Sequence, residues 1–394
     1  MCSLLEKSFE GIQCSTAKAS FTSLPSDRFS HSTAFQFFQP LPQLSGFANY
    51  VKENLCAATD TSCAASAERL GRATSLDISY DAISHALKVT SSWPFEKQPL
   101  KVQARTNHRT EVGVLAADTP PNLEPHELGV SGLLTVLGQD SKPSSTLFAF
   151  PSRHRDAEST FEVKVLEPTG LHPTLQILLK SNKAPRDDES CSPHAYFTFP
   201  RTIFADKYQL ADGLFLASKN LTALRYTSQP VDLEAPDYAM QLWGSAVLLE
   251  LAPPNAQETQ SWTAEIPLHL RYLSPLSGGY RNIAIPYPAV FWACAAEEGT
   301  KFPTNPFDKV NLGYDGLFGP RTVFWHVEPQ PSRGDQLSNI IQVPVLDLDK
   351  GQWVNAGTTV VILVGFAMIL WRLVSVYSRP GLGSSQTPRD KKKQ

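Results

Sequence analysis

One apolar run near the C-terminus constrains this chain more than any other feature. Val354–Trp371 contains no charged residue, and at about 1.5 Å per residue a helix over it spans roughly 27 Å, close to the hydrocarbon thickness of a bilayer. Arg372 interrupts the run, but the helix can continue while the guanidinium reaches the headgroups. A buried core helix is the alternative, and too few residues follow to enclose one. The sequence predicts a single transmembrane helix over residues 354–376.

The charges beside this run predict its orientation. The basic residues that follow are Arg372, Arg379, Arg389, Lys391, Lys392 and Lys393. Before it, Lys350 accompanies Asp347 and Asp349. Because basic residues favour the cytoplasmic side, we expect a cytosolic tail at 377–394 and a luminal region before the helix. A GPI-attachment signal is excluded, since it has no basic tail beyond its apolar stretch.

The N-terminal residues bear on how that region crosses the membrane. Residues 1–10 hold no apolar stretch of the length that a signal peptide needs. The sequence therefore predicts no cleaved leader. Two explanations stay open: the single span directs insertion, or translation starts elsewhere.

Two residue types are compatible with a luminal location. Asn220-Leu-Thr222 is a glycosylation acceptor triplet, although such a triplet also arises by chance. The six cysteines are Cys2, Cys14, Cys56, Cys63, Cys191 and Cys294. They could form disulfides in an oxidising compartment, and Cys191 with Cys294 is the pair that we suggest, with free buried thiols as the alternative.

The last residues of the tail match an address signal. Lys391 and Lys392 stand four and three places from the end, as in a dilysine retrieval signal. This predicts residence in the endoplasmic reticulum membrane. The alternative is an ordinary basic flank of the span.

The remainder of the chain has the pattern of a β protein. Residues 1–73 lack sustained periodicity, and we expect them to be irregular or partly helical. From residue 74 short alternating segments follow one another, with proline-containing turns between them. The polar segment 181–190 is the best candidate for a boundary. We therefore expect a β-rich region at 74–180 and a β domain at 190–345, both luminal and sandwich-like, before the transmembrane helix.

The clearest predicted strand is 266–272. Its alternation places Ile266, Leu268, Leu270 and Tyr272 on one face and His269 and Arg271 on the other. A second strand at 283–287 would complete a hairpin with it. His269, Arg271 and Tyr272 are candidates for partner contact, with an ordinary solvent-facing strand as the alternative.

Composition and motifs give no sign of catalysis. Net charge is −3 with 35 basic and 38 acidic residues, so no basic field suggests a nucleic-acid partner. We find no nucleophile elbow, phosphate loop, H-E-x-x-H or C-x-x-C motif, and Cys56 and Cys63 lack nearby histidines for a zinc site. His154, among charged neighbours, is expected in a solvated loop. Asp347 and Asp349 could act as paired carboxylates, but they also suit the flank of a membrane span. No cofactor is expected.

Several ordered motifs resemble a known family. They are Phe197–Arg201, Phe204–Leu210, Val231–Pro236, Ile266–Tyr272, Ile285–Pro288, Cys294, Asn305–Asp308 and Leu312–Gly319. In this order they are similar to the PIG-X family and its fungal counterparts. The resemblance covers about residues 190–330 and continues into the single span.

That resemblance implies a function. PIG-X proteins are non-catalytic subunits of GPI mannosyltransferase I, which adds the first mannose to glucosaminyl-phosphatidylinositol. The expected partners are a multi-spanning PIG-M-type catalytic subunit and the lipid bilayer. A luminal chaperone-like or protein-maturation factor with many clients, and a cell-surface adhesion receptor, are the alternatives.

Overall fold

The computed structural model describes residues 2–24, 34–94, 102, 104, 109–124, 126–167, 170–180, 184–185, 191–228, 234–254, 262–303, 312–332, 334 and 336–378. The chain forms two compact units. One comprises Met1–Leu273 and Ile283–Ile341, and the other comprises Ser274–Asn282 and Gln342–Gln394.

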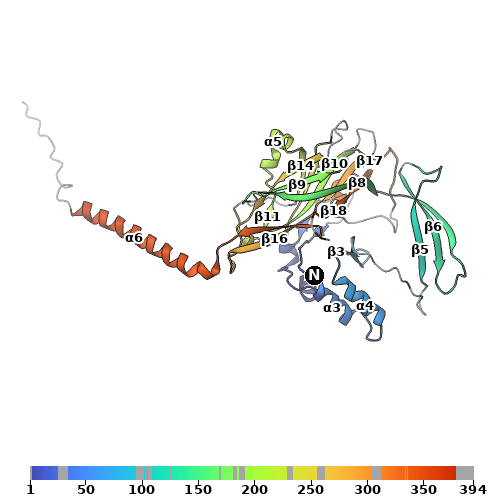
Figure 1. The fold of residues 1–394 in the computed structure, drawn as a ribbon, viewed down its shortest axis with the longest axis horizontal. Helices are drawn as coiled ribbons and strands as arrows, with labels where there is room; N and C mark the ends of the chain where they lie inside the picture. Colours follow the sequence, from blue (N-terminus) through green and yellow to red (C-terminus); the bar gives the residue numbers. More distant parts are fainter. Residues whose placement is uncertain are drawn as a thin grey trace, which may run out of the picture. The chain divides into compact units, whose positions relative to one another are not determined.

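Helices lie mainly near the two ends of the chain (Figure 1). The α-helices are α1 (Cys2–Ser8), α2 (Ala17–Ser20), α3 (Ser45–Asn54), α4 (Thr61–Leu70), α5 (Gly213–Ser218) and α6 (Gly351–Tyr377). The 3₁₀ turns are η1 (Gln209–Ala211), η2 (Asp237–Ala239), η3 (Asp315–Leu317) and η4 (Leu348–Lys350). Helix α4 begins after Asp60, whose carboxylate accepts a hydrogen bond from the Cys63 backbone at 2.9 Å. Helices α1 and α3 meet where Phe9 stacks on Phe47 at 4.6 Å.

Strands dominate the middle of the chain. They are β1 (Thr22–Ser23), β2 (Phe35–Gln36), β3 (Ser75–Asp81), β4 (Ala86–Ser92), β5 (Glu111–Asp118), β6 (Glu127–Val136), β7 (Ser144–Pro151), β8 (His154–Leu166), β9 (Thr174–Leu179), β10 (Cys191–Pro200), β11 (Ile203–Phe204), β12 (Leu221–Thr227), β13 (Gly244–Leu251), β14 (Trp262–Pro267), β15 (His269–Leu270), β16 (Tyr280–Pro286), β17 (Ala289–Ala295), β18 (Thr322–Gln330) and β19 (Ser338–Pro344). The predicted mainly β fold is confirmed.

The largest sheet has eight strands in the order β12-β13-β10-β17-β18-β8-β9-β14. All neighbours are antiparallel except β18 and β8, which run parallel. Strands β8 and β9 precede the polar segment 181–190, yet they pair with strands that follow it. The sheet therefore continues across the boundary that the sequence suggested.

The hairpin predicted between 266–272 and 283–287 is not formed. Strand β14 pairs with β9, and β16 pairs with β19, so the expected pairing of 266–272 with 283–287 is wrong. Alternation indicates that a segment is a strand, but several strands share the same pattern and compete as partners. Both strands instead pair with strands that are distant in the sequence.

One face of this sheet forms the main core. Register partners place Phe161 opposite Leu179, and Leu179 opposite Trp262. The same alternation continues across β10 and β13, where Phe197 faces Val247. The core residues on this face are Phe161, Val163, Leu175, Ile177, Leu179, Phe197, Phe199, Val247, Leu249, Leu251, Trp262, Ala264 and Ile266, all buried. Along each strand these residues alternate with period 2, as one face of a sheet requires.

The first and last strands of the sheet approach each other. The Glu265 backbone N–H of β14 donates to the Lys219 carbonyl, next to β12, at 3.0 Å. Asn220 Nδ2 donates to the Thr263 carbonyl at 2.7 Å, and Lys219 Nζ lies 2.5 Å from the Glu265 carboxylate. These bonds draw the edges together around the core, which limits the exposed backbone that open edges present.

The opposite face of strands β13, β10, β17 and β18 carries an aromatic cluster. Its buried members are Tyr196, Trp243, Ala246, Leu248, Phe291, Ala293, Tyr314 and Phe324. The N-terminal segment covers part of it: Phe37 and Phe38 pack against the cluster, and Trp243 Nε1 donates to the Gln36 carbonyl at 3.0 Å. Residues 35–38 are therefore part of the β domain's packing and not a separate N-terminal segment.

Two smaller sheets are formed by the residues that follow α4 and precede β8 along the chain. Strands β3 and β4 form a hairpin, and β5, β6 and β7 form a three-stranded sheet. Large apolar side chains are exposed on both, including Leu87 and Val114.

The second unit contains α6, which begins three residues before the predicted span and ends one residue after it. The structure contains one candidate span in its described residues, Leu348–Tyr377, with none of its apolar window buried. The predicted single apolar helix is confirmed.

Candidate partner-binding surface

Four segments meet around β15. Strand β11 pairs with β15, with Ile203 opposite Leu270. The Leu270 backbone N–H donates to the Leu171 carbonyl at 2.9 Å. Gln209 of η1 is bonded to His269, and the Asp237 N–H of η2 donates to the Tyr272 carbonyl at 3.0 Å. We call the half-buried His269 and the exposed side chains of Leu171, His172, Tyr208, Tyr238 and Tyr272 the His269 surface.

His269 is held by three neighbours. Its ring stacks on Phe204 at 5.4 Å, its Nδ1 lies 3.1 Å from Nδ1 of His172, and its Nε2 lies 3.3 Å from the Gln209 side-chain oxygen. Burial lowers the pKa of His269, the nearby His172 lowers it further, and Asp206 opposes the shift. The ring is therefore a neutral hydrogen-bonding group at neutral pH.

Arg271 does not face solvent as the alternation predicted. It is buried, its guanidinium lies 4.4 Å from the Phe204 ring centre, and its Nη1 donates to the Ala235 carbonyl at 2.8 Å. Strand β15 ends at Leu270, so the alternation stops one residue before Arg271. Arg271 joins β11, β15 and the segment before η2, and it is not accessible to a partner.

Tyr272 also departs from the predicted alternation, because it is exposed where the pattern predicted a buried side chain. The alternation grouped it with Ile266, Leu268 and Leu270, which are buried, but 69% of Tyr272 is exposed. Tyr208 and Tyr238 are each 66% exposed. Tyrosine is enriched at protein interfaces because its ring supplies apolar area while its hydroxyl bonds to polar groups.

Histidine pairs are the polar feature that sequence reasoning missed. His154 is buried in β8 and not in a solvated loop, and its Nδ1 lies 3.0 Å from Nε2 of His326. The parallel pairing of β8 with β18 brings these residues together, and no short spacing could reveal it. Within the described ranges no three His, Cys, Asp or Glu side chains are grouped to hold a metal ion.

All six cysteines are paired. Cys191 and Cys294 are register partners on β10 and β17 and form a disulfide with S–S 2.05 Å. Cys56 bonds to Cys63, so neither supplies a thiolate to zinc.

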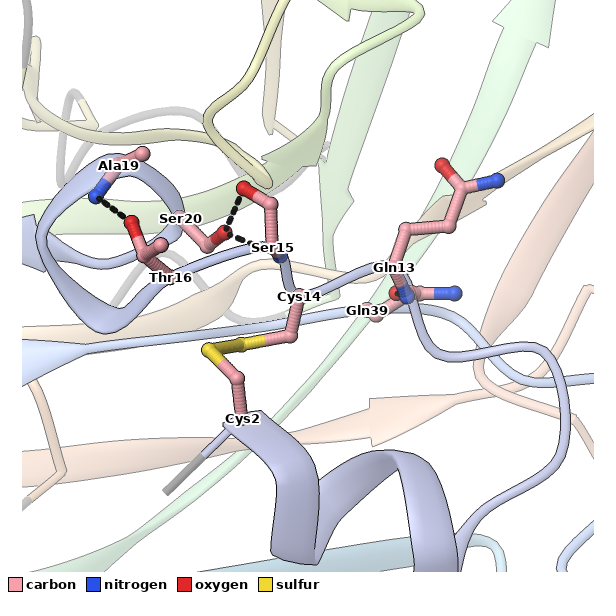
Figure 2. Close-up of a disulfide and its surroundings, with 8 residues drawn as sticks. All are labelled: Cys2, Gln13, Cys14, Ser15, Thr16, Ala19, Ser20 and Gln39. Atoms are coloured by element: carbon pink, nitrogen blue, oxygen red, sulfur yellow. Dashed lines mark hydrogen bonds between the residues drawn. A yellow bond between two sulfur atoms is a disulfide. The ribbon is translucent and has the colours of Figure 1, made fainter.

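The third disulfide joins Cys2 to Cys14 at the start of the chain (Figure 2). Beside it, Ser20 Oγ accepts a hydrogen bond from the Ser15 backbone at 3.1 Å. Gln39 accepts one from the Gln13 backbone at 3.0 Å, so the first residues are bonded to the segment that covers the aromatic cluster.

Asn220 has a structural role of its own. It follows α5 with φ of 56°, a left-handed conformation that asparagine tolerates better than most residues. It is exposed, and its amide donates to Thr263 as described above. The residue type is thus explained without a glycan.

The remaining predicted residues divide between the second unit and the undescribed part. Asp347 caps η4 by accepting from the Asp349 backbone at 3.1 Å, which is the role of a helix-flanking carboxylate. Lys391 and Lys392 lie outside the described residues, as does the motif at 305–308.

Comparisons with known proteins agree with the motif order. The family model described as PIG-X / PBN1 matches residues 168–374. The protein called pbn1 of Neurospora crassa is 64% identical over 382 residues, covering 97% of this chain and 76% of that protein. The PBN1 protein of Gibberella zeae is 49% identical over 377 residues, 95% of this chain and 76% of that protein. For the PBN1 protein of Yarrowia lipolytica the values are 31% over 313 residues, 74% and 60%.

The matched region begins just after β8 and contains the rest of the large sheet, the His269 surface and most of α6. It starts earlier than the motifs at 190–330 suggested, because β9 belongs to the same sheet. The chain belongs to the PIG-X/PBN1 family.

Proposed function

We propose that this chain is the non-catalytic subunit that stabilises the mannosyltransferase adding the first mannose to glucosaminyl-phosphatidylinositol. The observation that carries the proposal is the PIG-X / PBN1 match over residues 168–374. Membership of this family supports a role in GPI-anchor biosynthesis. The stabilising role and the PIG-M-type partner are the finer parts of the proposal.

In this proposal the β domain contacts luminal loops of the multi-spanning partner through the His269 surface. Exposed tyrosines suit such a contact because they bury large areas with little loss of side-chain freedom. Of the three residues that the sequence suggested, His269 and Tyr272 belong to this surface, while Arg271 supports it from beneath. Helix α6 packs beside the partner's spans.

The three disulfides support a luminal location for the β domain. Disulfides persist in oxidising compartments, and the pairs extend from Cys2 to Cys294, so this whole stretch belongs on one side of the membrane. Together with the basic tail, they favour a luminal β domain and a cytosolic C-terminus. Loss of an endoglycosidase-sensitive mobility shift in Asn220→Gln checks both the glycan and the orientation.

Residence in the endoplasmic reticulum rests on Lys391 and Lys392. Replacing both with Ser should redistribute the full chain to later compartments if they form a retrieval signal. An unchanged distribution would contradict that role and leave them as a basic flank of the span.

Deleting the chain tests the main proposal. The catalytic subunit's abundance and first-mannose transfer should both fall, and unchanged values for both would sink the idea. A client-wide loss of unrelated proteins without a selective GPI defect would favour the chaperone-like alternative.

A matched pair of variants tests the surface. Tyr272→Ala should lower co-purification of the catalytic subunit while this chain's own abundance stays constant. Tyr80→Ala in β3, where 50% of the tyrosine is exposed, is the control and should leave co-purification unchanged. Equal effects of the two changes would remove the His269 surface from the proposal.

A further inference from the structure

In the second unit, the segment that precedes α6 is hydrogen-bonded to residues 274–280. The Leu276 N–H donates to the Leu346 carbonyl at 3.1 Å, and the Val345 N–H donates to the Gly279 carbonyl at 2.9 Å. Leu276 and Asp347 also form a parallel bridge. We call residues 274–280 and 345–350 the juxtamembrane collar.

The collar reverses the usual arrangement of polar and apolar side chains. The Asp347 side chain is only 21% exposed and accepts hydrogen bonds from the backbones of Gly278 at 3.3 Å and Asp349 at 3.1 Å. The leucines point outward instead, with Leu276 41%, Leu346 48% and Leu348 54% exposed. The hydrogen bonds of Asp347 account for the inward carboxylate, whereas the three exposed leucines on these two bonded segments are unfavourable in water.

Chain continuity gives the location of these leucines relative to the bilayer. Leu348 begins η4, and α6 starts directly after η4 at Gly351. The predicted hydrocarbon span begins at Val354, six residues after Leu348. Six helical residues rise about 9 Å, which reaches the outer part of an interfacial layer about 5–7 Å thick. The collar therefore lies at the level of the headgroups whenever α6 spans the membrane.

Trp353 agrees with this depth. It is in the first turn of α6, and 81% of it is exposed. Tryptophan concentrates at membrane interfaces because its ring is apolar while its N–H can bond to water or headgroups. Asp349 and Lys350 of the collar are exposed as well, and their charges can remain among the headgroups.

We propose that the juxtamembrane collar is a second membrane contact of this chain, in which Leu276, Leu346 and Leu348 insert into the interfacial lipid layer beside α6. The occupant of this apolar surface is lipid. Because the two collar segments are bonded to each other, the contact holds the start of α6 at a set depth. The proposal does not depend on the mannosyltransferase partner.

Quenching measurements on the full chain in phosphatidylcholine vesicles test the contact. Leu276→Cys and Leu346→Cys would each carry a small fluorophore, and Glu298→Cys, at an exposed position of the β domain, is the aqueous reference. The collar labels should be about three-fold less sensitive to iodide than the reference, because the interfacial layer excludes the anion. They should also be quenched by lipids that carry a spin label near the headgroup, and the reference should not.

The outcomes decide between lipid and other occupants. Collar labels that match the Glu298 label in both measurements would overturn the proposal, as would protection that arises only after a partner protein is added. Intact mass of each labelled chain checks that the native disulfides are retained. A fluorophore on Trp353→Cys, measured with and without Leu276→Ser, gives a second readout: the label should become less accessible to the lipid quencher in the Leu276→Ser chain if the collar sets the depth.

Discussion

Strands β9 and β5 have similar apolar content but different surroundings. In β9, Leu175, Ile177 and Leu179 are no more than 1% exposed, because β8 and β14 flank the strand and the curved sheet encloses its inner face. In β5, Val114 is 73% exposed, although the strand is paired to β6 along its length. Pairing thus makes a strand, but only a second layer or closure buries its side chains.

The comparison predicts very different costs for truncating the two strands. Ile177→Ala should lower the free energy of unfolding by about 2–5 kcal/mol, because it leaves a cavity in the closed core. Val114→Ala should change it by no more than about 0.5 kcal/mol, since the side chain already lies in solvent. Urea unfolding of the full chain in detergent, followed by tryptophan fluorescence, measures both. A large cost at Val114 would mean that its face is covered in the protein as purified.

The same contrast occurs between two adjacent residues, Arg271 and Tyr272. Arg271→Ala removes a stacked guanidinium and its bond to Ala235, and should cost about 2–4 kcal/mol of unfolding free energy. Tyr272→Ala should cost about 0.5 kcal/mol or less, because the ring is exposed.

Arg271→Lys separates charge from shape at this position. Lysine retains the charge but cannot stack or donate in the same planar geometry, so most of the loss should remain. Thermal unfolding of the three variants gives the comparison. A tyrosine variant as unstable as Arg271→Ala would contradict the assignment of Tyr272 to the surface.

Residue pattern predicted these regions unequally, for physical reasons. The alternation predicted over 266–270 gave the buried face correctly, since Ile266, Leu268 and Leu270 are all buried. It failed at Arg271 and Tyr272 because β15 is only two residues long. Alternation of apolar and polar residues does not show at which residue a strand ends.

Long-range pairing was the second limit. The approach of His154 to His326 depends on β8 entering the sheet beside β18, which no local pattern specifies. The helix α6 was predicted closely because hydrocarbon imposes both its length and its composition. The exposed faces of β5, β6 and β7 have no comparable signal, since apolar residues there resemble those of a core.

The smallest expected effect is on the pH dependence of the free energy of unfolding, which should differ between a buried and an exposed histidine. His194 is buried in β10, stacks on Phe291 at 5.8 Å and donates from Nδ1 to the Ser192 carbonyl at 3.0 Å. Burial lowers the pKa of His194 from its ordinary value of 6.5, and the bond to Ser192 and the charge of Glu250 only partly offset this effect. Below pH 6.5 the unfolded chain therefore binds the proton more readily than the folded chain. The free energy of unfolding should fall as pH drops from 6.5 toward the lowered pKa of the folded state.

Substitution tests this assignment at two histidines. His194→Gln should remove part of the pH-dependent loss, since the new side chain does not titrate in this range. His85→Gln, at an exposed turn of the β3–β4 hairpin, is the control and should retain the parent's slope. Chemical unfolding between pH 7.5 and 5 gives both slopes. If both variants reduce the pH dependence of the free energy of unfolding equally, burial of His194 does not cause that dependence. Enclosed and open strands would then not differ in how their histidines affect stability.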